Sequence, residues 1–274
     1  KWSLLLKTTT IIRAVKKEQE IIQSYIEKTK NIAGIISDNR FGCYSKQLPS
    51  VYMTHQLNVL SGFLTPISSY IHQQIIRKYD ECWIPDEENS LFSGKLSRSS
   101  KNLHQKYIGV LSRFKKQELP QEIDVLILLS GPEPNRTQLE DKLKEIFKTS
   151  NKRVCLIQGK VEETQKITQL HQLKIVNFML SGELEHTINS SKIIICRAGY
   201  SSILDLVSLN KEALLIPTKY QNEQEYLAKY LQEKGVFSFI EEKDIDKKIV
   251  NISIKPSVTG FKKQEFNTDL FYLF

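Results

Sequence analysis

The sequence contains no apolar run that approaches the roughly 20 residues needed to cross a bilayer as a helix. Its opening WSLLL segment is too short for a signal-peptide core, and no small-residue cleavage site follows it. The four cysteines never show CxxC spacing, which argues against a zinc motif and against a disulfide framework. These absences favour reduced, buried thiols, and we expect a cytoplasmic location.

What is present fits an ordinary globular protein. A chain of 274 residues can hold two domains, and 40% hydrophobic with 26% charged residues is a typical composition. The net charge of +8 is compatible with a lysine-rich surface, or with attraction to anionic lipid head groups or a diphosphate. Nucleic acid is not expected as a partner, because there is neither an aromatic-rich RNA motif nor a basic recognition helix.

The most informative stretch is residues 192–224. A buried strand over 193–196 leads into an Arg-Ala-Gly turn at 197–199, and an amphipathic helix follows. A second buried strand over 213–216 ends at a proline. Strand, helix and strand at this spacing predict a crossover unit of a parallel sheet, and the whole chain is expected to be an α/β protein.

The chemistry of this unit lies in its turn. Gly199 can adopt positive φ, and the free N–H groups at the helix start form an anion site. Ser201 and Ser202 add hydroxyl donors, and Asp205 can accept two hydrogen bonds from a vicinal diol such as a ribose. Phosphate donors followed by a diol acceptor suit a nucleotide. The alternative is a buried strand, an N-cap serine and an aspartate that favours the helix dipole.

The same stretch resembles the nucleotide-binding half of GT-B glycosyltransferases, and in particular family 28, which includes the lipid II-forming UDP-N-acetylglucosamine transferase. The resemblance is carried by an Arg-Ala-Gly turn, a serine, an acidic residue, a proline-ended strand and a glutamine-rich loop. Asp205 stands where the family usually has Glu. The resemblance implies two Rossmann-like parallel-sheet domains: a partial acceptor-side domain over 1–113 and a nucleotide-sugar-binding domain over 114–274.

The resemblance also implies further donor contacts. Ser130 and Gly131 partly match a Gly-Gly-Ser phosphate loop, and Arg136 either reaches a phosphate or pairs with neighbouring glutamates. Phe178 matches a residue that packs on the base and offers backbone hydrogen bonds to uracil, although it could equally be a core residue. The full expected donor set is Ser130, Gly131, Arg136, Phe178, Met179, Arg197, Gly199, Ser201, Ser202, Asp205, Gln221, Gln224 and Glu225.

In the first domain, polar residues follow two buried strands, where open α/β sheets place ligands. Asp38 and His55 are the candidate catalytic bases, with a structural histidine as the alternative for His55. Arg40 and Asn58 are expected on the acceptor side. An amphipathic helix over 1–30 should face the core, residues 86–100 should form a surface loop, and 113–121 is the linker candidate.

The family resemblance therefore predicts an inverting glycosyltransferase that uses a UDP-sugar, specifically UDP-N-acetylglucosamine, and a glycan or lipid-linked acceptor. The helix start would stabilise the leaving diphosphate without a metal, and no cofactor beyond the donor is expected. A peripheral contact with the inner membrane face is compatible with this function. GT-B chains begin with a strand and a glycine-rich loop that are not found here, so the resemblance implies that the start of the first domain is missing.

Two other functions remain open at this point. One is a UDP-N-acetylglucosamine 2-epimerase, which shares the architecture but needs carboxylates around the anomeric carbon. The other is a non-catalytic nucleotide-sugar-binding protein.

Overall fold

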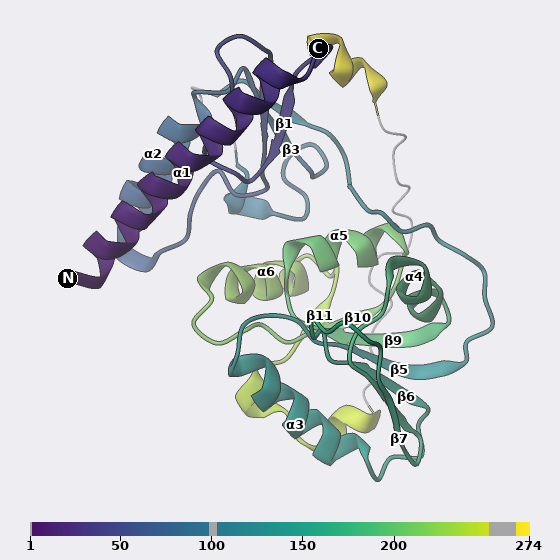
Figure 1. Ribbon diagram of the computed structural model, residues 1–274. Helices are drawn as coiled ribbons and strands as arrows, with labels where there is room; N and C mark the ends of the chain where they lie inside the picture. The colour runs from purple at the N-terminus through teal and green to yellow at the C-terminus, as the bar shows by residue number, and fades with distance from the viewer. Residues whose placement is uncertain (1, 99–102, 252–266) are drawn as a thin grey trace. The chain divides into compact units, whose positions relative to one another are not determined.

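The computed structural model describes residues 2–98, 103–251 and 267–274 (Figure 1). The chain divides into two compact units, one of residues 1–109 with 264–274 and one of residues 110–263. The division differs from the expected 113/114 boundary and from the expected placement of the C-terminal end. The physical reason for the second difference is aromatic packing, because the rings of Phe271 and Phe274 lie edge-on to Trp83 of the first unit.

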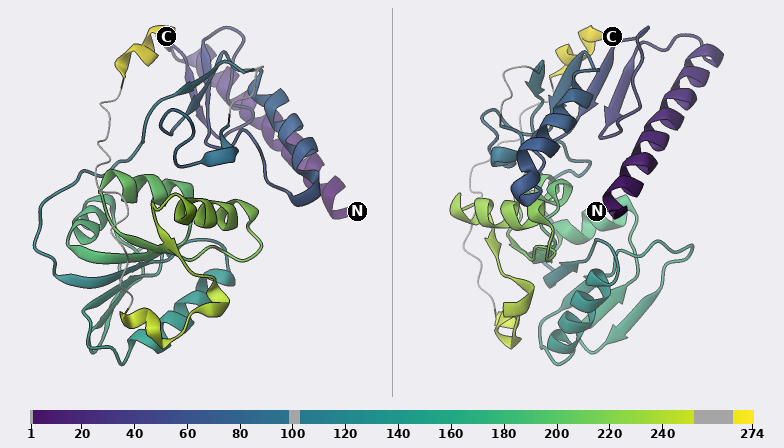
Figure 2. Two further views of the ribbon diagram at one scale, coloured as in Figure 1. Left: turned by 180° about the vertical axis from the view of Figure 1, so that it is seen from behind. Right: turned by 90° about the vertical axis from the view of Figure 1, so that its left-hand side faces the viewer.

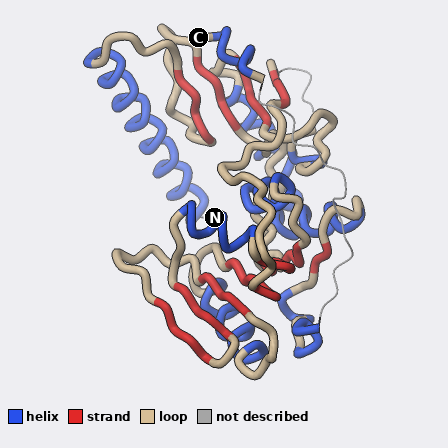
Figure 3. Tube along the Cα trace, turned by 90° about the vertical axis from the view of Figure 1, so that its right-hand side faces the viewer, coloured by secondary structure: helices blue, strands red, loops and turns tan. Residues whose placement is uncertain are grey.

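The second unit is built on a seven-stranded sheet of order β11-β10-β9-β5-β6-β8-β7 (Figures 1 and 3). All neighbouring pairs are parallel except β7 and β8, which form an antiparallel pair. The strands are β5 (Ile123–Leu128), β6 (Val154–Ile157), β7 (Ile167–Leu170), β8 (Leu173–Val176), β9 (Ser191–Cys196), β10 (Ala213–Leu215) and β11 (Ser238–Phe239).

Helices cover both faces of this sheet, with α3 (Asn135–Phe147) on one face and α5 (Tyr200–Ser208) and α6 (Asn222–Glu233) on the other (Figures 1 and 2). On the α3 face, Leu139, Leu143 and Phe147 pack on the apolar side chains of the central strands. Helix α4 (Ser181–Asn189) precedes β9, and η3 (Glu242–Asp244) and η4 (Lys247–Asn251) follow β11. Because β5 starts the sheet but lies at its centre, the strand order reverses between β5 and β9. Such a switch point is where open α/β sheets bind ligands.

The first unit has a parallel four-stranded sheet of order β1-β2-β3-β4. The strands are β1 (Ile35–Asp38), β2 (Ser50–Met53), β3 (Glu81–Ile84) and β4 (Gln105–Tyr107), and the helices are α1 (Trp2–Lys28), α2 (Thr65–Ile76), η1 (Gly62–Leu64), η2 (Gly94–Leu96) and η5 (Thr268–Leu273). Helix α2 buries Ile76 against Tyr52 and Ile84 of the sheet. No helix in the described ranges is both long and apolar enough to cross a membrane.

Two expectations for the first unit are wrong. Helix α1 does not face a core: among residues 10–28, whose side chains are described, none is buried, and Ile12 and Ile21 are exposed. Residues 86–97 are not a surface loop either. Asp86 is fully buried and accepts hydrogen bonds from the backbone N–H groups of Phe92 (3.0 Å) and Ser93 (2.7 Å), so a buried carboxylate organises this segment.

Candidate functional site

A cavity of about 220 Å³ opens at the switch point of the second unit. Its walls come from the segments that follow the carboxyl ends of four parallel strands, β5, β6, β8 and β9, together with residues that precede β5. Five residues of the predicted donor set line it: Ser130, Phe178, Met179, Ser202 and Asp205. The sheet topology thus brings residues from three distant segments of the sequence to one place.

Asp205 lies on α5 and faces this cavity. Its Oδ1 accepts a hydrogen bond of 2.6 Å from the Ser112 hydroxyl, and that hydroxyl in turn accepts one of 3.1 Å from the Phe114 N–H. These two linked hydrogen bonds fix the carboxylate at the cavity wall. The carboxylate is therefore oriented before any ligand arrives.

Sequence reasoning missed the wall contributed by Arg113 and Phe114, because it assigned them to a linker. Both line the cavity, with the Arg113 guanidinium 4.8 Å from the centre of the Phe114 ring. The segment that follows is tied to α4, since Gln117 N–H donates to Asn189 Oδ1 (3.1 Å) and Asn189 Nδ2 donates to Lys115 O (3.0 Å). A charged, proline-containing composition did not reveal these long-range bonds.

Phe178 lies at the cavity, and its backbone groups have protein partners. The Phe178 N–H donates to Asn177 Oδ1 (3.0 Å), and its carbonyl accepts from Gln165 Nε2 (3.0 Å). The N–H group is therefore engaged by a protein partner, whereas the carbonyl oxygen has a second lone pair that a base could use. The ring and Met179 line the cavity and provide an apolar wall for a base.

The backbone of Gly199 does not have the positive φ that the sequence suggested. Gly199 has φ −79°, which any residue adopts, so positive φ is not its role. The nearest atom to a Cβ built there would be Ser202 Oγ at 4.0 Å, and the turn is open rather than sealed. In the loops that follow β5 and β6, Gly131 (φ +103°) and Gly159 (φ +68°) do have positive φ, and a Cβ at Gly159 would lie only 2.2 Å from Leu129 O.

Two arginines of the predicted donor set are engaged by partners within the protein. The Arg197 side chain is only 1% exposed, and it bonds Glu242 Oε2 (2.8 Å) and Asn135 O (2.9 Å), so it holds loops together behind the site. Arg136 is buried and bonds Glu140 Oε2 at 2.7 Å as well as Glu133. Burial opposes ionisation of Glu140, but hydrogen bonds from Lys144, Gln158 and Arg136 hold its pKa below the usual value.

The glutamine-rich loop is also tied internally. Gln224 Oε1 accepts from the Thr218 N–H (2.9 Å), and its Nε2 donates to Gln221 Oε1 (2.7 Å). Glu225 Oε1 accepts from the Tyr220 N–H (2.8 Å), which holds Tyr220 at φ +67°. Glu225 also lines a separate cavity of about 390 Å³. These side chains therefore fix the loop after β10. Ser201, another residue of the predicted donor set, is exposed at the start of α5 and does not line the switch-point cavity.

In the first unit, Asp38 ends β1 and is exposed, and His55 follows β2, the strand next to it. Both therefore stand beyond the carboxyl edge of the first sheet. Arg40 pairs with Glu18 at 2.7 Å, and Asn58 Nδ2 donates to the backbone oxygen of Lys95 (2.8 Å). Arg40 and Asn58 thus have structural contacts that the acceptor-side prediction did not include.

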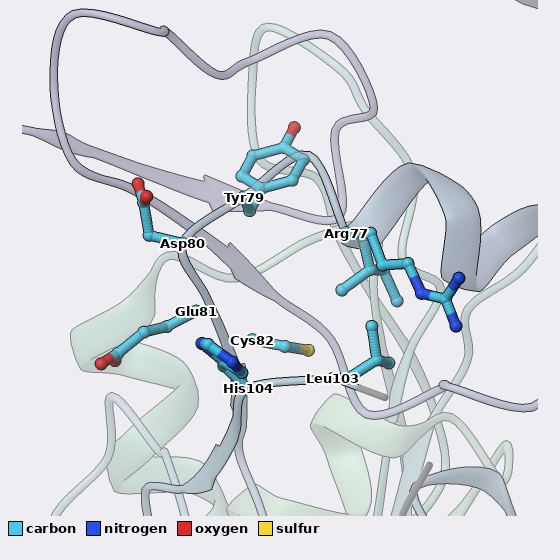
Figure 4. Close-up of a pocket in the computed structure, with 8 residues that line it drawn as sticks. Arg77, Tyr79, Asp80, Glu81, Cys82, Leu103 and His104 are labelled. Carbon is cyan, nitrogen blue, oxygen red and sulfur yellow. The ribbon is translucent and has the colours of Figure 1, made fainter. Parts of the chain in front are cut away.

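A further cavity of about 130 Å³ lies beside β3 and is lined by polar residues (Figure 4). The Arg77 guanidinium and the Glu81 carboxylate point away from each other in Figure 4. Asp80 accepts from the Ser50 N–H (2.7 Å), and Glu81 pairs with Lys106 at 2.5 Å. The carboxylates are engaged in holding strands, and no convergent polar site results. Within the described ranges, no three His, Cys, Asp or Glu side chains gather where they could hold a metal.

Comparison with known proteins gives the fold and the family resemblance. Residues 133–268 match the model of the glycosyltransferase family 28 C-terminal domain. Among solved structures, Acinetobacter baumannii MurG aligns with TM-score 0.52 and 12% identity over 89% of this chain and 69% of that one. The calicheamicin glycosyltransferase CalG4 aligns with TM-score 0.56 and 10% identity over 88% and 71%.

Curated relatives carry the name UDP-N-acetylglucosamine–N-acetylmuramyl-(pentapeptide) pyrophosphoryl-undecaprenol N-acetylglucosamine transferase. The one from Sulfurihydrogenibium sp. is 21% identical over 220 residues, covering 79% of this chain and 57% of its own length. The one from Caldanaerobacter subterraneus is 29% identical over 155 residues, covering 50% and 42%. The chain therefore has the GT-B fold and resembles the family 28 glycosyltransferases, whose C-terminal domain model it matches over residues 133–268.

Proposed function

We propose that this chain is a glycosyltransferase that takes a sugar from a UDP-sugar bound at the switch-point cavity of the second unit. The observation that carries the proposal is the convergence of Ser130, Ser202 and Asp205 with an aromatic wall in one cavity. That cavity lies largely in the segment that matches the family 28 C-terminal domain. Neither the fold nor the cavity alone would support this function, because one fold hosts many activities.

Each part of the nucleotide would have a matching group. The base would lie against Phe178 and Met179, and the ribose diol would donate to the Asp205 carboxylate. The diphosphate would lie at the start of α5, where backbone N–H groups and the positive helix end favour an anion. The protein itself would then stabilise the charge that develops on the leaving UDP, and we propose that no metal or further cofactor is needed.

The proposed reaction is a single displacement with inversion. An acceptor hydroxyl attacks the anomeric carbon, the bond from that carbon to the diphosphate oxygen breaks, and UDP leaves with the electron pair. A base takes the hydroxyl proton, and Asp38 or His55 is the proposed base because both stand beyond the carboxyl edge of the first sheet. We place Arg40 and Asn58 nearby as acceptor-side groups.

The enzyme name of the curated relatives supports N-acetylglucosamine as the donor sugar and a pyrophosphoryl-undecaprenol-linked acceptor. We propose a lipid-linked acceptor of that class for this chain, and action at the inner membrane face from the cytoplasm. One side of η1 and α2 fits such a surface. Phe63 is 90% exposed, and Ile67, Tyr70 and Ile71 follow it at helical spacing with exposed side chains.

Lipid contact is tested by sedimentation with vesicles of anionic and of neutral lipid. The variant Ile67→Ser/Ile71→Ser should lose most of the bound fraction, because it removes two apolar side chains from one helix face. Val161→Ser, which changes an exposed apolar residue of the second unit, is the matched control and should bind as the wild type does. Equal binding by both variants would rule out this face as the contact.

The donor proposal is tested by thermal unfolding in the presence of UDP, CDP, GDP, ADP and UDP-N-acetylglucosamine. Uridine nucleotides should raise the melting temperature, because a ligand that binds only the folded state stabilises it, whereas purine nucleotides should not. No shift with any uridine nucleotide would refute the donor site. Incubation with UDP-N-acetylglucosamine alone should give no isomeric sugar, and release of an isomer would favour an epimerase instead.

A further inference from the structure

Thr218 has a buried hydroxyl whose position suggests a ligand. Its residue is 1% exposed, and Oγ1 has no hydrogen-bond partner among the described residues. A buried hydroxyl without a partner destabilises the folded protein relative to one that is satisfied. Such a group in a folded protein calls for an explanation, and an oxygen atom supplied by a ligand is one.

The surroundings place this hydroxyl beside the donor site. Thr218 follows β10, and the nearest atom to a Cβ built on Gly131 would be Thr218 Oγ1 at 4.0 Å. Gly131 is the residue after Ser130, which lines the cavity. The loop that follows β10 therefore reaches across the end of β9 to the loop that follows β5. The N-terminus of α5, where we place the diphosphate, also follows β9.

The backbone around Thr218 is held firmly. Gln224 Oε1 accepts from its N–H at 2.9 Å, and the Arg197 guanidinium contacts the carbonyl oxygen of the preceding Pro217 at 3.4 Å. Gln224 and Arg197 thus act behind this position and not as direct donor contacts. A hydroxyl on a fixed backbone is a pre-organised donor for an anion.

We propose that the Thr218 hydroxyl donates to the second phosphate of the bound nucleoside diphosphate and so distinguishes UDP from UMP. The inference rests on the proposed function, because it needs UDP at the cavity. Asp205, Ser130 and Ser202 line the cavity, and Thr218 lies outside the cavity wall, next to Gly131, the residue that follows Ser130. A phosphate held near Ser130 is therefore the part of the ligand that would meet the hydroxyl. Gly131 is exposed and has no side chain, so no side chain at this position blocks the approach.

The test is Thr218→Val, which replaces the hydroxyl with a methyl group of similar size. The affinities for UMP and UDP are measured by calorimetry, with the melting temperature of the free protein. UDP affinity should fall about tenfold or more, as expected for a lost hydrogen bond to a charged group, and UMP affinity should change less than about threefold. The melting temperature should stay the same or rise, because the variant removes an unsatisfied buried group.

The opposite signs of these two effects separate a ligand contact from damage to the fold. Thr187→Val is the matched control, because the Thr187 hydroxyl is satisfied by Glu183 O at 2.8 Å. That variant should lower the melting temperature and leave the ratio of UDP to UMP affinity unchanged. Thr218→Ser should restore most of the UDP affinity.

Three results would overturn the inference. Equal losses of UMP and UDP affinity in Thr218→Val would mean a structural role, and unchanged UDP affinity would mean no contact. A loss confined to UDP-N-acetylglucosamine would move the contact to the sugar. If the wild-type protein binds neither UMP nor UDP, the proposed donor site fails and the inference fails with it, a result distinct from the other three.

Discussion

Replacing Asp205 with alanine is the sharpest test of the proposed nucleotide site in the second unit. The carboxylate lines the cavity and is held by Ser112 at 2.6 Å, and in the proposed complex it accepts from both ribose hydroxyls. Each hydrogen bond to a charged group contributes about 1.5–3 kcal/mol. Because the ribose hydroxyls regain water when the acid is removed, we take the lower end for both bonds, about 3 kcal/mol in all, and expect UDP affinity to fall by roughly 150-fold.

The assay compares UDP with 2′-deoxy-UDP in the wild type and in Asp205→Ala by calorimetry. In the wild type, the missing hydroxyl should lower affinity about tenfold, since one hydrogen bond to the carboxylate is lost. In the variant, the two ligands should bind within about threefold of each other, because no acid remains to distinguish them. Measuring two ligands on two proteins forms a double-mutant-type cycle. The cycle separates the contact between the acid and the ribose from any general weakening of the site.

The control is Asp124→Ala at the opposite end of the same sheet, near the start of β5. Asp124 pairs with Arg153 at 3.0 Å and with Lys192 at 2.8 Å, so its loss should lower stability while the preference for UDP over 2′-deoxy-UDP is kept. If Asp205→Ala weakens both ligands equally and preserves the wild-type preference, the assignment of Asp205 to the ribose is wrong.

Three further outcomes follow from the structure. Ser112→Ala should weaken UMP and UDP equally, by severalfold in calorimetry, because it loosens the ribose-binding acid that both ligands share; an effect on UDP alone would contradict this role. Burial in the first unit lowers the pKa of His72 to about 4 from 6.5, so the unfolded chain binds more protons between these values. Stability should therefore fall as pH drops from about 6.5 toward 4, by at most about 1.4 kcal/mol per pH unit, and urea unfolding of His72→Leu should lack this slope. Burial raises the pKa of all four thiols, but only Cys43 is not fully buried, so it should react fastest with a thiol reagent in the native protein. Mass spectrometry counts the labelled thiols, and rapid labelling of all four would contradict the burial.

The elements of the second unit could be predicted because their signals are local. The run at 193–196 is continuously apolar, the helix after it has a clear apolar stripe, and the strand at 213–216 ends at a proline, so each element is marked by its own residues. The observed strands β9 and β10 lie within a few residues of these ranges. The antiparallel strand β7 was missed because its residues are all exposed and carry no apolar alternation.

The roles of charged residues could not be predicted in the same way. Arg197 stands in a turn beside the site, but its partner Glu242 lies 45 positions away, and only the folded chain shows that this pair buries the guanidinium. Arg136 had its partners close in sequence, at Glu133 and Glu140, and the sequence left pairing and phosphate binding as equal alternatives. Local spacing identifies which groups can pair, whereas burial decides whether any group remains for a ligand.

The contact between Ser112 and Asp205 shows what the departure from the family residue means for this site. Asp is one methylene shorter than the Glu expected there, so its carboxylate extends less far from α5 into the cavity. The Ser112 hydroxyl, 93 positions earlier in the chain, reaches the same carboxylate and links it to the segment that carries Arg113 and Phe114. The shorter acid is therefore held by a second segment of the cavity wall. This bond fixes the orientation of a carboxylate that extends less far into the cavity than that of Glu would. No pattern within α5 could show this, because the partner Ser112 lies 93 positions away, directly before the residues predicted to form a linker.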